Sequence, residues 1–125
     1  MSHLTERFAA AVQTLVSDGP LKQRLIRAFG DHLGALSHAD LPMAVRREFM
    51  DLQEALQRRV PVGSESRVQA TVQKMSSSEA SAHAGTIVRL YVALLGELER
   101  AEPLKVVTSP LVVAKKAPRF LKNRP

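Results

Sequence analysis

The four histidines are the first residues to consider for metal binding or acid–base catalysis, because imidazole serves both roles near neutral pH. They are His3, His32, His38 and His83. No two stand four residues apart, the spacing that places a pair on one helical face, and no HExxH pattern occurs. His32, His38 and Asp40 are near enough in sequence to form a candidate site. Surface histidines are the simpler interpretation, so we expect no metal and no cofactor.

Three carboxylates, Glu48, Asp51 and Glu54, recur at three-residue steps in one region of the chain. An acid–base pair needs carboxylates in a cleft, where the surroundings separate their pKa values. Arginines accompany these acids in the sequence, namely Arg46, Arg47, Arg58 and Arg59. The pattern therefore predicts an exposed helical face with ion pairs three or four residues apart, each contributing about 0.2–0.5 kcal/mol.

Motifs for nucleophilic or phosphoryl chemistry are missing from the sequence. The serines at 76–78 lack a GxSxG context, and no glycine-rich phosphate loop occurs. The chain has no cysteine, which excludes thiolate catalysis and a disulfide framework. We therefore expect a protein that is not an enzyme.

The stretch SRVQATVQKM, residues 66–75, resembles a DNA-recognition helix in composition. Arg67, Gln69, Gln73 and Lys74 would be its base or phosphate contacts. A helix-turn-helix needs a tight turn before that helix, whereas the preceding VPVGSES is long and contains proline. We keep this as an alternative.

Positive charge is confined to the end of the chain. Residues 1–102 hold twelve of the eighteen Lys and Arg and all twelve Asp and Glu, so their formal charge is zero. Residues 103–125 carry the whole excess of +6, together with four prolines. The sequence therefore predicts a neutral body and a basic tail.

The first part of the tail contains two proline-led apolar stretches, PLKVV from residue 103 and PLVVA from residue 110. Proline and β-branched residues disfavour helix and favour extended chain. Such a segment could lie in a groove of its own body or pair with a partner's strand edge. The predicted partner-binding residues are Leu104, Val106, Val107, Leu111, Val112 and Val113.

The last part of the tail, KKAPRFLKNRP, is too poor in apolar residues to fold alone. Its cations would suit RNA, DNA or an anionic membrane surface, and its phenylalanine could stack on a base. The predicted phosphate-binding residues are Lys115, Lys116, Arg119, Phe120, Lys122 and Arg124.

The body that must position these groups has helical periodicity throughout. Apolar residues recur at three- and four-residue steps in about 2–17, 20–36, 42–59 and 76–101, with a shorter pattern within 64–75. Isolated helices of this length are marginal in water, so their apolar faces must pack together. We predict an all-α fold: a compact bundle of four to five mostly antiparallel helices over residues 1–102, followed by an extended tail at 103–125.

Helix ends are marked by specific residues. Asp18-Gly19-Pro20 predicts a break between the first two helices, Asp40 predicts a cap for the third, and Ser76 with Glu79 predicts a capping box for the last. The second helix carries one predicted apolar stripe of Leu21, Leu25, Phe29, Leu33 and Leu36. The last helix carries a wide apolar face of Ile87, Val88, Tyr91, Leu94, Leu95 and Leu98.

Aromatic residues are few, and we expect Phe8, Phe29, Phe49 and Tyr91 to meet in the core. No stretch is apolar enough for a membrane span or a secretion signal, so we expect a cytoplasmic protein. The leading hypothesis is a protein–protein interaction or adaptor module that binds a partner or itself. The alternative is a nucleic-acid-associated protein that binds phosphates through its tail.

Overall fold

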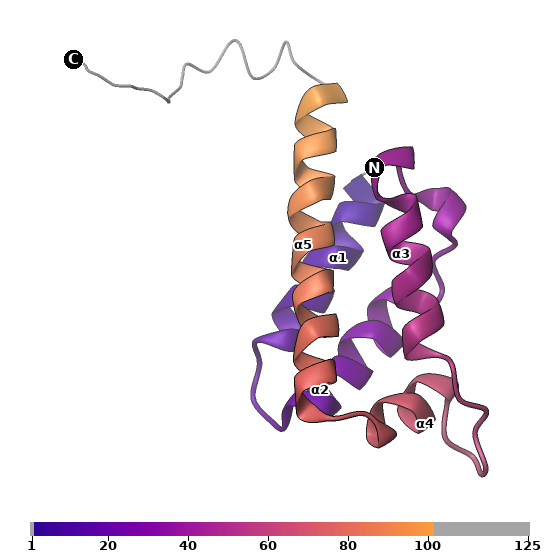
Figure 1. The fold of residues 1–125 in the computed structure, drawn as a ribbon. Helices are drawn as coiled ribbons and strands as arrows, with labels where there is room; N and C mark the ends of the chain where they lie inside the picture. Colours follow the sequence, from indigo (N-terminus) through magenta and orange to yellow (C-terminus); the bar gives the residue numbers. More distant parts are fainter. Residues whose placement is uncertain (1, 102–125) are drawn as a thin grey trace. The chain divides into compact units, whose positions relative to one another are not determined.

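The computed structural model describes residues 2–101, and the chain divides into two units, residues 1–94 and 95–125. The described residues form α-helices and short helical turns and contain no strand, which confirms the all-α prediction (Figure 1). The elements in chain order are α1 Ser2–Leu15, α2 Leu21–Ala28, the π-helical turn η1 Phe29–Leu33, the 3-10 turn η2 His38–Asp40, α3 Met43–Leu56, α4 Arg67–Lys74 and α5 Ser77–Ala101.

The predicted tail, residues 103–125, lies outside the described residues, and so does the predicted boundary at residue 102. Both stay predictions. Of the second unit, the structure describes residues 95–101, the last turns of α5, where Arg100 forms an ion pair with Glu97. None of the helices within residues 2–101 is long and apolar enough to cross a membrane.

The first unit is held together by one aliphatic core to which all five helices contribute. Phe8, Phe29 and Phe49 are fully buried in it, and Tyr91 packs against it while staying partly exposed. The rings of Phe8 and Phe49 meet edge to face, with centroids 5.9 Å apart. The predicted aromatic core is therefore confirmed for the three phenylalanines, and Tyr91 lies at its margin.

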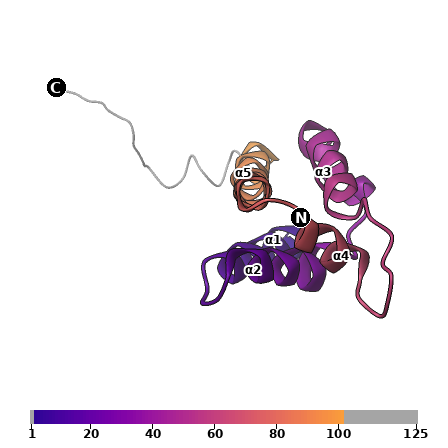
Figure 2. The same cartoon turned by 60° about the horizontal axis from the view of Figure 1, so that its bottom comes forward.

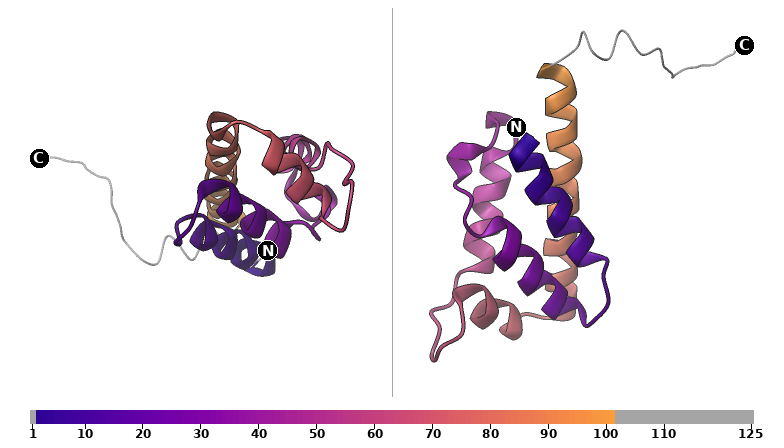
Figure 3. Two further views of the ribbon diagram at one scale, coloured as in Figure 1. Left: turned by 90° about the horizontal axis from the view of Figure 1, so that it is seen from below. Right: turned by 180° about the vertical axis from the view of Figure 1, so that it is seen from behind.

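α1 and α2 lie side by side and are joined by a short turn (Figure 3). Gly19 takes a φ of 113°, a left-handed conformation that favours glycine. Arg24 of α2 closes the turn, because its guanidinium donates to the carbonyl oxygens of Gly19 at 2.7 Å and Leu15 at 2.6 Å. The predicted break at Asp18-Gly19-Pro20 is confirmed.

The second helix does not run unbroken to Leu36, as its apolar stripe predicted, since the α-helical pattern ends at Ala28. In the π turn that follows, the N–H of Gly34 donates to the carbonyl of Phe29 at 2.7 Å. α1 contributes too: Arg7 donates to the carbonyl of His32 at 3.1 Å. The imidazole of His32 lies 3.2 Å from the hydroxyl oxygen of Thr14. Tertiary contacts to α1 thus support a turn that sequence periodicity alone did not predict.

The predicted cap of the third helix is wrong. Asp40 does not cap α3; its carboxylate accepts from the backbone N–H of Ser37 at 3.0 Å and so closes η2. Pro42 occupies the N-cap position of α3 without a side-chain bond. Leu41 separates Asp40 from that position, so the carboxylate stands two residues before the N-cap.

α4 is the short helix predicted within 64–75, and its N-cap Ser66 accepts from the N–H of Gln69 at 3.1 Å. The capping box of α5 is confirmed as well. The N–H of Ser76 donates to Glu79, and the N–H of Glu79 donates to Ser76, each at 3.0 Å. α4 lies at the end of the first unit where α3 ends and α5 begins (Figure 2).

Candidate functional site

The residues predicted to bind a partner or phosphates all belong to 103–125 and lie outside the described residues. Two surface features of residues 2–101 remain as candidates. One is an exposed aliphatic row on α5, and the other is a basic pocket where α3, α4 and α5 come together.

The exposed row on α5 is called the α5 seam here, and its residues are all exposed. They are Ser81, Gly85, Val88, Val92 and Leu95. Their spacing alternates between four and three residues, which keeps them on one side of a helix. Val92 is 61% exposed, Val88 40% and Leu95 38%. The α5 seam is therefore an apolar strip that no described part of the chain covers.

The wide apolar face predicted for this helix is only partly buried. Ile87 and Leu94 are buried as expected, but Val88 and Leu95 are exposed. A helix packed against neighbours on one side covers only part of so broad a face. The spacing of apolar residues does not show how many neighbouring helices reach such a face.

Gly85 lies between Ser81 and Val88 in the α5 seam. A β-carbon built at Gly85 would meet nothing within 4 Å, so no described residue packs against this position. Glycine inside a helix costs about 1 kcal/mol relative to alanine. Packing within the described residues therefore does not account for Gly85.

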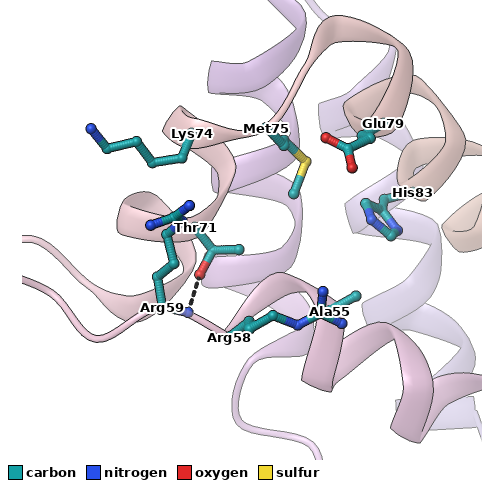
Figure 4. Close-up of a pocket in the computed structure, with 8 residues that line it drawn as sticks. All are labelled: Ala55, Arg58, Arg59, Thr71, Lys74, Met75, Glu79 and His83. Atoms are coloured by element: carbon teal, nitrogen blue, oxygen red, sulfur yellow. Dashed lines mark hydrogen bonds between the residues drawn. The ribbon is translucent and has the colours of Figure 1, made fainter.

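The basic pocket is a half-open hollow of about 170 Å³ and is shown in Figure 4. Its lining residues come from the end of α3, the loop after it, α4 and the first turns of α5. They are Ala55, Arg58, Arg59, Thr71, Lys74, Met75, Glu79 and His83. The set combines three cations, one imidazole and one carboxylate around a partly apolar floor. Cations thus outnumber the one carboxylate in this set.

Two hydrogen bonds fix the backbone beside the pocket. The N–H of Arg59 donates to the hydroxyl oxygen of Thr71 at 2.9 Å, and Thr71 is buried on α4. Arg67 donates to the carbonyl of Gln57 at 3.1 Å. The segment that carries Arg58 is thus tied to α4 at both of its ends.

Two residues considered for metal or acid–base chemistry, His32 and Asp40, make separate contacts in the structure. His32 belongs to the π turn beside Thr14, and Asp40 is engaged at Ser37. Within residues 2–101, no three His, Asp or Glu side chains are grouped so that they could hold a metal ion. His83 is the half-buried histidine that lines the basic pocket.

The acidic face of α3 forms the predicted ion pairs in part. Arg47 pairs with Asp51 at 3.3 Å, four residues on. Glu48 pairs instead with Arg89 of α5 at 2.8 Å, a contact between helices that spacing along one helix does not reveal. Both pairs are exposed, so their contribution to stability is small.

The helix considered for DNA recognition is α4. Its Val68, Thr71 and Val72 are buried, while Arg67 and Lys74 are exposed. The loop between α3 and α4 spans residues 57–66, longer than a helix-turn-helix requires. The exposed cations of α4 line two hollows at this end of α3. Lys74 lines the basic pocket, and Arg67 lines a second hollow.

Comparison of the sequence with protein-family models, with curated proteins and with solved structures gives no match.

Proposed function

We propose that the protein is a non-enzymatic interaction module that pairs with a second copy of itself through the α5 seam. In this proposal residues 1–102 form a compact bundle of mostly antiparallel helices, and residues 103–125 add a peptide-like contact. The observation that carries the proposal is the row of exposed aliphatic side chains along α5.

The spacing of the seam suits a helix as its partner. Rows that alternate by three and four residues are the contact pattern of paired helices. Burying Val88, Val92 and Leu95 would stabilise the complex by about 25 cal/mol for each Å² of apolar surface removed from water. Contiguous apolar patches on a protein surface mark interaction sites when they are large.

The seam is complementary to itself when two α5 helices run antiparallel. Ser81 and Leu95 each stand seven residues from Val88, while Gly85 and Val92 stand three and four residues from it. With Val88 facing Val88 of the second copy, small residues of one helix lie opposite large aliphatic residues of the other. Small-opposite-large packing lets two helix backbones approach closely. This pattern favours a second copy over an unrelated partner.

Sedimentation velocity over a range of protein concentrations tests the proposal. The wild-type chain is expected to dimerise with increasing concentration, and Val92→Glu is expected to stay monomeric because it places a charge in the contact. Val62→Glu is the matched control, since Val62 is 97% exposed and lies in the loop before α4. A wild-type chain that is monomeric at every concentration would contradict the proposal.

The tail contributes to the proposal through its two proline-led stretches. A chain that ends at Glu102 is expected to fold as the full chain does but to associate more weakly. The helical pattern of residues 2–101 supports independent folding, because their apolar side chains already share one core. If association is unchanged after this truncation, the tail has no part in it, and the α5 seam alone remains as the proposed contact.

Nucleic-acid binding through the tail is the second candidate. It is favoured by six Lys and Arg residues with no acid in 103–125. Release of counterions from phosphates would make such binding strongly dependent on salt.

A further inference from the structure

We propose that the basic pocket at the junction of α3, α4 and α5 binds a phosphate group, with Arg58 and Arg59 as its main ligands. This site is separate from the α5 seam and from the tail, and it goes beyond the interaction function proposed above. Lys74 and His83 complete it at the rim.

The unused hydrogen-bond donors of Arg58 and Arg59 are the first argument. Every other arginine within residues 2–101 has at least one guanidinium hydrogen bond. The acceptors are carbonyl or side-chain atoms for Arg7, Arg24, Arg27, Arg46 and Arg67, and carboxylates for Arg47, Arg89 and Arg100. Among the described residues, the guanidinium groups of Arg58 and Arg59 have no such protein partner; both residues are exposed, so their donors are open to solvent and available to a ligand.

The position of these two side chains is the second argument. Adjacent in sequence, they line the same pocket from different sides. Figure 4 shows Arg58 extending toward Ala55, below Glu79 and His83, while Arg59 extends alongside Thr71. A guanidinium offers donors in a planar fork that matches two oxygens of a phosphate. Because the two side chains extend in different directions, the fork of one arginine would hold the phosphate while the other arginine adds positive charge.

The backbone beneath the arginines is already fixed. The N–H of Arg59 is bonded to buried Thr71, and the carbonyl of Gln57 is bonded to Arg67. Binding would order the two side chains but would not have to order the loop that carries them. Less conformational entropy is then lost when the ligand binds.

The local charge favours an anion despite the carboxylate of Glu79. That carboxylate is occupied by the backbone N–H of Ser76 at 3.0 Å, as part of the capping box. Three cations line the pocket against this one acid. The first turns of α5 also line it, and a helix N-terminus carries a partial positive charge.

The hollow, about 170 Å³ and open to solvent, has room for a phosphate group. The oxygens of a phosphate are acceptors for a guanidinium fork. Free phosphate and a phosphomonoester present the same chemistry, and the experiment distinguishes them.

The test is a titration of the full-length chain, followed by two-dimensional amide NMR, with inorganic phosphate as the probe and chloride at equal ionic strength as the reference. Saturable shifts are expected at the amides of Arg59, Thr71 and His83. The double variant Arg58→Gln/Arg59→Gln is expected to bind about tenfold or more weakly, because charge-assisted hydrogen bonds are lost. Its thermal unfolding is expected to match the wild type, since neither guanidinium has a partner in the fold.

Arg47→Gln is the matched control, because this exposed arginine lies on α3 outside the basic pocket. It is expected to bind phosphate as the wild type does. The proposal is overturned if shifts do not saturate, if they are not greater than those in chloride, or if the double variant binds like Arg47→Gln.

Adenosine 5′-monophosphate and adenosine distinguish the sources of the phosphate. Equal affinities for inorganic phosphate and the nucleotide would identify the phosphate group alone as the ligand. Tighter binding of the nucleotide, with no binding of adenosine, would identify a phosphomonoester. Binding of adenosine at the same amides and with the nucleotide's affinity would overturn the proposal.

Discussion

Phe8 of α1 and Phe49 of α3 meet edge to face at a centroid distance of 5.9 Å, and both are fully buried. This contact joins two helices that are distant in sequence. Edge-to-face pairs contribute about 0.5–1.5 kcal/mol beyond the burial of their area.

Replacing Phe49 by alanine is expected to lower the free energy of unfolding by about 3–5 kcal/mol, since it leaves a cavity against Phe8. Urea unfolding measures the loss. Met50→Ala is the control: Met50 follows Phe49 on α3 but is 39% exposed, so its change should stay within about 0.5 kcal/mol. Equal losses for the two variants would show that the ring contact is not formed.

Replacing Thr71 by valine is expected to cost about 1–3 kcal/mol, because the N–H of Arg59 loses its acceptor while the shape of the side chain is kept. Thr71→Ser retains the hydroxyl and is expected to preserve the bond. Amide hydrogen exchange gives the direct measurement, since the N–H of Arg59 should exchange faster in the valine variant alone. Unchanged exchange in Thr71→Val would contradict the hydrogen bond between the N–H of Arg59 and Thr71.

Replacing Ser76 by alanine is expected to destabilise the protein by about 1 kcal/mol, because Ser76 accepts from the N–H of Glu79 at the start of α5. Thermal unfolding followed by circular dichroism measures this loss. Ser78→Ala is the matched control, as Ser78 is exposed and lies just inside the same helix. A loss as large in Ser78→Ala would argue against the capping box.

Cysteine at position 88 is expected to cross-link two copies of the chain, because the proposed antiparallel seam places Val88 opposite itself. The natural chain has no cysteine, so Val88→Cys introduces the sole thiol. Non-reducing electrophoresis after mild oxidation should show a dimer. Val62→Cys, with its more exposed position, should cross-link less; a rate that simply follows exposure would count against the seam.

Binding of RNA or DNA through the tail would follow the salt concentration. If all six cations of 103–125 met phosphates on duplex DNA, log K would fall with log salt by a slope of about 5. Lys115→Gln/Lys116→Gln should reduce that slope by about 2. Fluorescence anisotropy at several salt concentrations measures it, and a flat response would remove this second candidate.

Features that depend on neighbours in sequence could be predicted from the sequence. The break at Gly19 and the capping box of Ser76 and Glu79 each involve residues close together in the chain, and both are present. The buried phenylalanines followed from helical spacing. Local chemistry determines these features, so a single sequence contains enough information.

Features that depend on residues distant in the chain could not be predicted from the sequence. The π turn is supported by Arg7 of α1, and the exposure of Val88 depends on which helices cover α5. The basic pocket combines Arg58, in the loop after α3, with His83 on α5, two residues that no pattern in the sequence connects. The adjacent arginines gave no clear signal in the sequence, because Glu54 stands four residues before Arg58, at the spacing of an ion pair within one helix.

The turn closed by Arg24 has a consequence for the order in which the chain assembles. The contacts between α1 and α2 span few residues, so we expect them to form early during folding. Phe49 and Leu90, which complete the core, are translated later. We therefore expect the apolar faces of α1 and α2 to stay exposed to solvent until α3 and α5 have been translated.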